Sequence, residues 1–168
     1  MPNVLVIGHS LTPRNLHIPN VHLTVLRKSG GRLNHLNTEP FCQAFEYSWD
    51  VVLIHLGGND LDDFTPSQCI DKICIFIKKL EVKKVILVET ENRKYLEWNR
   101  VGEKYRCRSN RLAKLIRSHA RFKGWGLVYT RNKSFFDNLR TDGIHLNAQG
   151  ESLLKNRYEE AIIKALGK

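Results

Sequence analysis

The residues of this chain that could do chemistry follow apolar runs at widely separated positions. Ser10 comes shortly after the apolar run Val4–Ile7 and follows Gly8 in a Gly-x-Ser pattern, while Asp142 and His145 stand three residues apart. Acyl transfer to a hydroxyl nucleophile needs a base that removes its proton and a carboxylate that orients the base. We therefore expect Ser10 as nucleophile, His145 as general base and Asp142 as the carboxylate that holds the imidazole.

The same chemistry needs hydrogen-bond donors for the negative charge that develops on the substrate oxygen. Gly30 can bring a backbone N–H close to that oxygen because it has no side chain in the way. Its neighbour Gly31 offers a second register for this role. Asn59 supplies a side-chain amide, and Ser10 supplies its own backbone N–H. The expected oxyanion hole therefore consists of Ser10, Gly30 and Asn59.

The elements that must position these residues begin with short, near-continuous apolar runs. Runs rich in β-branched residues cover 4–7, 51–54 and 85–88, and weaker runs cover 21–26 and 127–129. Continuous apolar runs of this length are typical of parallel strands that are buried on both faces. The sequence thus predicts a sheet of about five strands.

Helical spacing of apolar residues fills several intervals between these runs. Thr65–Gln68 has the pattern of a capping box with proline at the first helical position, and further helices are expected at about 105–122 and 148–166. Strands that alternate with helices predict an α/β fold: one domain over 1–168 with three α/β/α layers and a flavodoxin-like, doubly wound parallel sheet. Ligands of such sheets bind beyond the carboxyl ends of the strands, so all the polar blocks should meet at one rim.

Together and in this order, the blocks resemble those of the SGNH (GDSL-like) hydrolase superfamily. They read Gly8-x-Ser10-Leu11, Gly30, Gly57-x-Asn59-Asp60 and Asp142-x-x-His145. The resemblance spans residues 8 to 145 and implies the same flavodoxin-like fold, an oxyanion hole of Ser10, Gly30 and Asn59, and a triad completed by Asp142 and His145.

Two details of the sequence refine this resemblance. His9 stands where the family usually has an aspartate directly before the serine, and this exchange bears on the geometry of the turn. The flanking sequence 54–61 and the Asp-Gly-Ile-His-Leu block are also similar, more loosely, to SGNH esterase domains of transposable-element proteins.

The remaining histidines and the cysteines predict neither a metal nor a cofactor. His55 lies within an apolar run and reads as a core residue, while the four cysteines show neither C-x-x-C spacing nor clustering with histidine. This pattern favours reduced thiols and an intracellular location, cytoplasmic or nuclear. No apolar stretch approaches the roughly 20 residues of a membrane span.

One long polar segment, 90–104, lacks clean periodicity and carries two aromatic residues, Tyr95 and Trp98. Long connections of this kind often serve as lids or binding loops. Tyr95 and Trp98 are expected either to line a substrate pocket or to pack this loop onto the sheet.

The charge of the chain favours anionic partners. Lysine and arginine outnumber aspartate and glutamate by 27 to 17, and basic residues gather between 100 and 123. Such a cluster is either a solvated helix face or a site for the phosphates of nucleic acid or anionic lipid. The residues expected to make these contacts are Arg111, Lys114, Arg117 and Arg121.

Three functions follow from these observations, in order of preference. The first is a serine esterase that cleaves a small ester, acetyl or short acyl, through an acyl-serine intermediate. The second is a catalytically weak SGNH-fold accessory domain that binds nucleic acid or anionic lipid through the basic face. The third is a flavodoxin-like nucleotide or flavin binder, which ranks last because Gly8–Leu11 offers no phosphate cradle.

Overall fold

A computed structural model of the chain describes residues 1–93, 102–140, 142 and 144–167. Within these residues, five parallel strands form one sheet in the order β2-β1-β3-β4-β5. They are β1 (Asn3–Gly8), β2 (His22–Arg27), β3 (Ser48–His55), β4 (Glu81–Val88) and β5 (Gly126–Val128). The predicted flavodoxin-like parallel sheet is confirmed, including its two weaker strands.

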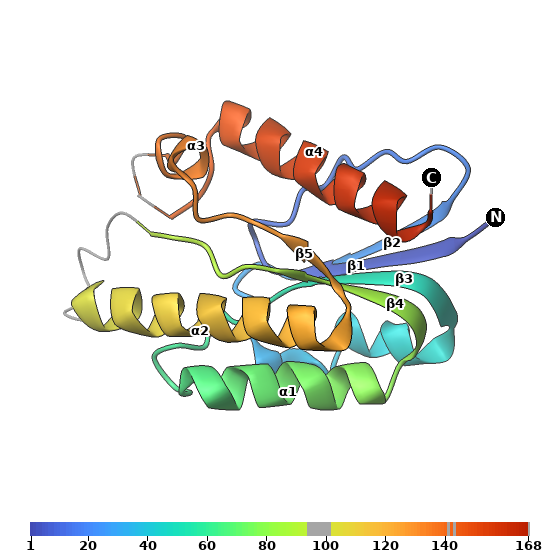
Figure 1. Cartoon of the computed structure of the whole chain (residues 1–168), viewed down its shortest axis with the longest axis horizontal. Coiled ribbons are helices and arrows are strands. Elements are labelled where there is room, and N and C mark those ends of the chain that lie inside the picture. The colour runs from blue at the N-terminus through green and yellow to red at the C-terminus, as the bar shows by residue number, and fades with distance from the viewer. Residues whose placement is uncertain (94–101, 141, 143, 168) are drawn as a thin grey trace.

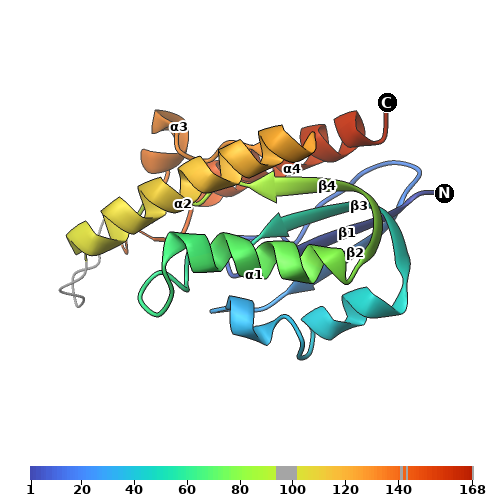
Figure 2. The same ribbon diagram turned by 60° about the horizontal axis from the view of Figure 1, so that its bottom comes forward.

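Helices cover both faces of this sheet, as Figures 1 and 2 show. One face carries α1 (Pro66–Lys78) and α2 (Gly102–Lys123), together with the short 3-10 helices η1 (Leu33–His35) and η2 (Phe41–Glu46). The other face carries α4 (Ala148–Ala165) and the single-turn helix α3 (Lys133–Phe136). The arrangement is the three-layer α/β/α sandwich that the alternating pattern predicts.

Side chains along each strand point alternately to the two faces of the sheet, and this divides the core into two apolar clusters. In β3, Val52 and Ile54 belong to the apolar cluster under α1 and α2, whereas Val51 and Leu53 belong to the cluster under α4. All four side chains are buried, because successive residues of a strand point to opposite faces and both faces are covered. This burial explains why the strand reads as a continuous apolar run.

The helices agree with the sequence patterns except where they are short. The hydroxyl of Thr65 accepts the N–H of Gln68, and the Gln68 side chain accepts the N–H of Thr65, so the predicted capping box begins α1. The elements η1, η2 and α3 were not expected, because a helix of one or two turns is too short to show a period. No helix in the described part of the chain is long and apolar enough to cross a membrane.

The strand order creates one crevice at the carboxyl ends of the strands. From β1 the chain passes to β2 on one side and then returns to β3 on the other, so the two connections leave the sheet in opposite directions between β1 and β3. Such a switch point is where open α/β sheets bind ligands. Ser10 follows β1 and Asn59 follows β3, so both lie beside this crevice.

A matched pair of substitutions in α1 tests which side of this helix stabilises the sandwich. Ile73 is 2% exposed, whereas Ile75 is 54% exposed. Ile73→Ala should lower the free energy of unfolding by about 2–5 kcal/mol, the usual cost of such a deletion in a core. Ile75→Ala should change it by less than about 1 kcal/mol. Urea denaturation of both variants measures this, and equal losses would contradict the assigned orientation of α1.

Candidate active site

Ser10, His145 and Asp142 form one continuous hydrogen-bonded chain in the structure. The Oγ of Ser10 lies 3.1 Å from Nε2 of His145, and Nδ1 of His145 lies 2.7 Å from Oδ2 of Asp142. A proton on Nδ1, donated to the carboxylate, leaves the Nε2 lone pair free to accept the serine hydroxyl. The arrangement can therefore remove a proton from Ser10.

The loop between α3 and α4 presents Asp142 and His145 to Ser10. Leu139 and Leu146 form an antiparallel bridge, and the N–H of Arg140 donates to the carbonyl of His145 at 2.6 Å. Within this narrow loop Oδ1 of Asp142 accepts two backbone N–H groups, that of Ile144 at 2.8 Å and that of His145 at 2.9 Å. One carboxylate oxygen thus fixes the loop, and the other oxygen fixes the imidazole.

These bonds also keep Asp142 ionised. Partial burial alone would raise the pKa of Asp142, but the N–H of Ile144 and the hydrogen bonds of His145 outweigh it and lower the pKa to about 2. At neutral pH the carboxylate is therefore an anion, and it accepts the hydrogen bond that orients the His145 imidazole.

A tight turn after β1 exposes Ser10. The N–H of Thr12 donates to the carbonyl of His9 at 3.1 Å, and a Cβ at Gly8 would lie 1.8 Å from the Thr12 hydroxyl, so only glycine fits there. From the end of β2, the guanidinium of Arg27 donates to the carbonyls of Ser10 at 2.7 Å and of Thr12 at 3.0 Å. Arg27 thus stabilises the turn that carries Ser10.

The two glycines after β2 differ in how their backbone N–H groups are used. The N–H of Gly31 donates to the carbonyl of Lys28 at 2.9 Å, whereas the N–H of Gly30 has no acceptor among the described residues. Gly30 also has a φ of +66°, in the left-handed region that favours glycine. The sequence left open whether Gly30 or Gly31 contributes a backbone N–H to the expected oxyanion hole, and the free N–H favours Gly30.

The side-chain amide of Asn59 is held from both ends. Its Nδ2 donates to the carbonyl of Gly31 at 3.1 Å, and its Oδ1 accepts from the Arg93 guanidinium at 2.9 Å. Because an amide nitrogen carries two hydrogens, one N–H of Asn59 remains for a ligand. The amide is thus oriented before any substrate arrives.

Beneath the Ser10 turn lies a buried network centred on Glu91, which follows the end of β4. Glu91 Oε2 lies 3.2 Å from Nε2 of His55, and its Oε1 lies 3.1 Å from the Arg93 guanidinium and 3.7 Å from Nε2 of His9. His55 also contacts the hydroxyl of Tyr158 in α4. The prediction that His55 is a satisfied core residue agrees with these contacts.

The donor set of this network fits hydrogen bonding better than a metal ion. One ligand atom from each of His9, His55 and Glu91 lies within 4.8 Å of the others, as in a metal site. However, Nδ1 of His9 accepts the N–H of Leu11 at 3.2 Å, so in the neutral imidazole the proton sits on Nε2, the atom that would have to bind the metal. The Arg93 cation also occupies the same carboxylate.

The charges in the network follow from burial and from Arg93. Burial alone would raise the pKa of Glu91, but its histidine neighbours and Arg93 hold that pKa well below its usual range. Complete burial lowers the pKa of His9 to about 4, although Glu91 opposes this shift. At neutral pH the network therefore contains an ionised Glu91 and a neutral His9.

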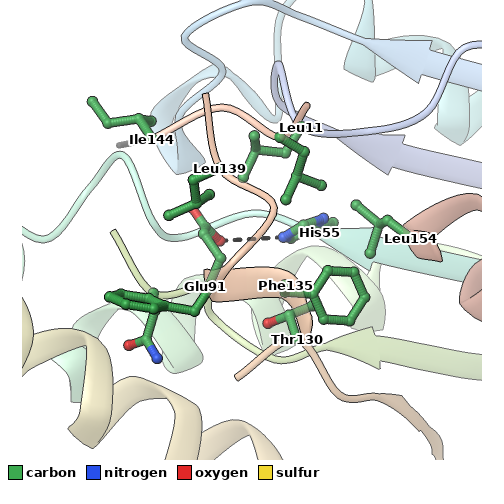
Figure 3. A pocket seen from close by; sticks show the side chains of 11 residues that line it. Leu11, His55, Glu91, Thr130, Phe135, Leu139, Ile144 and Leu154 are labelled. Carbon is green, nitrogen blue, oxygen red and sulfur yellow. Dashed lines mark hydrogen bonds and ion pairs between the residues drawn. The ribbon is translucent and has the colours of Figure 1, made fainter. Parts of the chain in front are cut away.

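Two kinds of hollow adjoin Ser10 and His145, an open polar kind and a small apolar pocket. An open one of about 460 Å³ contains Ser10 and His145 and is otherwise lined mainly by polar residues, namely Arg14, Arg27, Ser29, Arg140 and Glu151, with Leu11 and Leu146. The second is a small pocket of about 20 Å³. Figure 3 shows its apolar walls, which include Leu11, Leu139, Ile144, Phe135 and Leu154, and the dashed contact between His55 and Glu91 at its base.

The other residues predicted from the sequence lie in different places. Tyr95 and Trp98 fall outside the described residues. Arg111, Lys114 and Arg121 are exposed on α2, whereas Arg117 is partly exposed and forms an ion pair with the buried Glu89. Three of the four expected cations are thus exposed on α2, whereas Arg117 links α2 to the segment that follows β4.

Sequence reasoning missed Arg27, Glu91 and Arg93, although each belongs to the site. A signal existed for two of them, because Glu91 and Arg93 follow the apolar run of β4 directly and so belong to the rim where chemistry was expected. Arg27, the last residue of β2, offered no such pattern.

The depressed pKa of His9 predicts how the fold responds to acid. An unfolded histidine has a pKa of about 6.5, whereas that of His9 in the fold is about 4. The unfolded chain therefore binds this proton first, and His9 makes the free energy of unfolding fall as the pH drops from 6.5 to 4. An NMR titration should show the His9 imidazole unprotonated down to about pH 5. A midpoint near 6.5 would contradict its burial.

Comparison with known proteins identifies the fold. No protein-family model matches the sequence, and no curated protein does. Among solved structures, a lipase/acylhydrolase from Enterococcus faecalis has 19% identity and a TM-score of 0.74, covering 99% of this chain and 97% of its own. A carbohydrate acetylesterase family member from Sinorhizobium meliloti has 17% identity and a TM-score of 0.75, covering 100% of both chains.

A third structure, a member of the lipolytic G-D-S-L family from Veillonella parvula, has 12% identity and a TM-score of 0.74, covering 96% of this chain and 98% of its own. These likenesses extend over nearly the whole chain and include the sheet and both helical layers. The chain therefore has the fold of the SGNH (GDSL-like) hydrolases, as the order of its motif blocks predicted.

Proposed function

We propose that this chain is a serine esterase that hydrolyses a small ester, acetyl or another short acyl ester, through an acyl-Ser10 intermediate. The observation that carries the proposal is the unbroken chain from the Ser10 hydroxyl through His145 to Asp142, with contacts of 3.1 and 2.7 Å. Three N–H donors stand around the nucleophile turn and the neighbouring loops, on Ser10, Gly30 and Asn59.

The reaction proceeds in two balanced halves. Ser10 Oγ attacks the ester carbonyl while His145 Nε2 takes its proton, and the oxyanion of the tetrahedral intermediate is stabilised by N–H donors. When the C–O bond to the alcohol breaks, His145 returns the proton to the departing alcohol. Water then loses a proton to His145 and attacks the acyl group, and the acid is released as Ser10 recovers its hydrogen.

The preference for a short acyl group is supported by the space next to the triad. The apolar pocket of Figure 3 includes Leu11, next to Ser10, and Ile144 and Leu146, which flank His145. Its volume of about 20 Å³ is roughly that needed for one water molecule, so it suits a methyl group better than a long chain. The Sinorhizobium structures described as carbohydrate acetylesterases agree with this size.

Substitution of the triad tests the proposal. Ser10→Ala and His145→Ala should each lower the turnover of p-nitrophenyl acetate by on the order of 10⁴-fold, because each removes a group that acts in the transition state. The wild type should prefer acetate over butyrate. The measurement is the initial rate of p-nitrophenol release.

Exposed residues of the same types provide the controls. Ser118→Ala on α2 and His17→Ala should retain the wild-type rate, because both positions are exposed and outside the site. Equal labelling of wild type and Ser10→Ala by a fluorophosphonate probe would refute Ser10 as the nucleophile.

A second candidate function, an accessory domain that binds single-stranded nucleic acid, is favoured by the exposed cations of α2. Arg111, Lys114 and Arg121 are exposed and have no ion-pair partner within the described part of the chain. Such a surface contacts phosphates without reading bases, so its affinity should depend strongly on salt.

The salt dependence of binding tests this second candidate. Replacement of Arg111, Lys114 and Arg121 by glutamine should reduce the slope of log affinity against log salt by about 2, because three phosphate contacts are lost. A control with Lys133, Arg157 and Lys164 replaced by glutamine should keep the slope. Fluorescence anisotropy with a labelled oligonucleotide measures both. A slope unchanged in the first variant, or binding only to anionic vesicles, would overturn this function.

A further inference from the structure

The hollow that contains Ser10 and His145 is strongly electropositive. Among the described residues it is lined by Arg14, Arg27 and Arg140 and by a single carboxylate, Glu151. Glu151 is already paired with Arg140, whose guanidinium lies 3.2 Å from its Oε1. The other two arginines therefore face the hollow without a carboxylate partner among the described residues.

Arg27 is fixed in place by the protein itself. Its Nε and Nη2 donate to the carbonyls of Thr12 and Ser10, which leaves Nη1 without an acceptor in the part of the chain that the structure describes. A guanidinium held in this way loses little rotamer entropy when it binds an anion. Its free edge is a prepared donor beside the nucleophile.

Arg14 brings a second positive charge close to the first. Its side chain is exposed and has neither a hydrogen-bond nor an ion-pair partner within the described residues. Burial, and then the charge of Arg14, lower the pKa of Arg27, so the two cations repel each other across this surface. An anion seated between them would relieve that repulsion.

The position of His145 indicates which part of a substrate enters this hollow. The imidazole must stand beside the departing alcohol in order to return its proton. Because His145 lines the same hollow as the arginines, the alcohol side of the ester lies there. The small apolar pocket of Figure 3 shares Leu11 and Leu146 with this hollow but none of its arginines, and it suits the acyl group.

We propose that the hollow binds the alcohol part of an ester substrate and that this alcohol carries a carboxylate or phosphate group, held by Arg14 and Arg27. The inference rests on the proposed esterase function and deepens it, because it names the charge of the leaving alcohol. A neighbouring open hollow of about 350 Å³ is also lined by Ser10, Arg14 and Arg27, and it continues along the start of α4 to Lys155. There is therefore room for a group larger than the anion alone.

Two acetyl esters of nearly the same shape but different charge test the inference, with their hydrolysis by hydroxide measured as the reference for intrinsic reactivity. 4-Acetoxybenzoate carries a carboxylate on its leaving phenol, whereas 4-acetoxybenzamide has the same shape and is neutral. At low ionic strength the kcat/KM of the wild type should be about 5-fold higher or more for the benzoate, and 0.5 M salt should reduce this ratio because exposed charges are screened.

Substitutions show which residues determine the benzoate-to-benzamide ratio of kcat/KM. Arg14→Gln should lower the benzoate-to-benzamide ratio by about 2- to 5-fold, the range of one exposed ion pair. Glu151→Gln should raise the ratio, because it removes the one carboxylate of the hollow. Arg157→Gln, an exposed arginine further along α4, should leave the ratio and the activity unchanged. Circular dichroism verifies that each variant is folded.

The outcomes separate the two proposals. If the benzamide is hydrolysed and the benzoate is no better, or if Arg14→Gln leaves the ratio as it was, the anionic substrate is refuted while the esterase stands. If neither ester is hydrolysed and Ser10 reacts with no fluorophosphonate, the esterase function fails and this inference fails with it.

Discussion

The buried carboxylate of Glu91 is the interaction on which the geometry of the site depends. It contacts His55 at the end of β3, the Arg93 guanidinium, and His9 in the turn after β1, while its own chain segment follows β4. Three neighbouring strands are thereby joined at their carboxyl ends through one side chain. Through Arg93 the same network reaches Asn59, and its member His9 is the residue directly before Ser10.

Such a link between the strand ends is needed because every sequence motif of the site lies in a loop. Parallel strands bring loops to one rim, but they leave each loop free to shift by more than the fraction of an ångström that hydrogen-bonded catalysis tolerates. A buried carboxylate resists such shifts, since moving Arg93 away would leave its charge uncompensated in the interior, and moving His55 away would break a hydrogen bond to it. His9 takes part in this link at the position where an aspartate is usual, and an aspartate there would set a second negative charge against Glu91.

Much of the fold was predictable from the sequence, because burial on both sheet faces and helical periodicity leave direct patterns. The proximity of Ser10, His145 and Asp142 was also predictable, since Ser10 and the Asp142-x-x-His145 block carry recognisable spacings at the ends of elements. The residues that hold these side chains in place were not predictable from the sequence. Glu91 and Arg93 lie at the start of a polar segment that reads as a loop, and their function depends on contacts with residues more than 30 positions away. Nothing in local spacing reveals such contacts.

The two supports of Ser10 differ in their exposure and therefore in their consequences. His9 and Glu91 are buried, so this support is independent of substrate. Arg27 holds the Ser10 carbonyl and at the same time lines the open hollow. An anion bound to Arg27 would share this guanidinium with the Ser10 turn, and charge-assisted hydrogen bonds of this kind are shorter and stronger than neutral ones. In the proposed reaction, binding of the leaving group and alignment of Ser10 would thus be coupled through Arg27, which would give a matched substrate an advantage in the reaction step as well as in affinity.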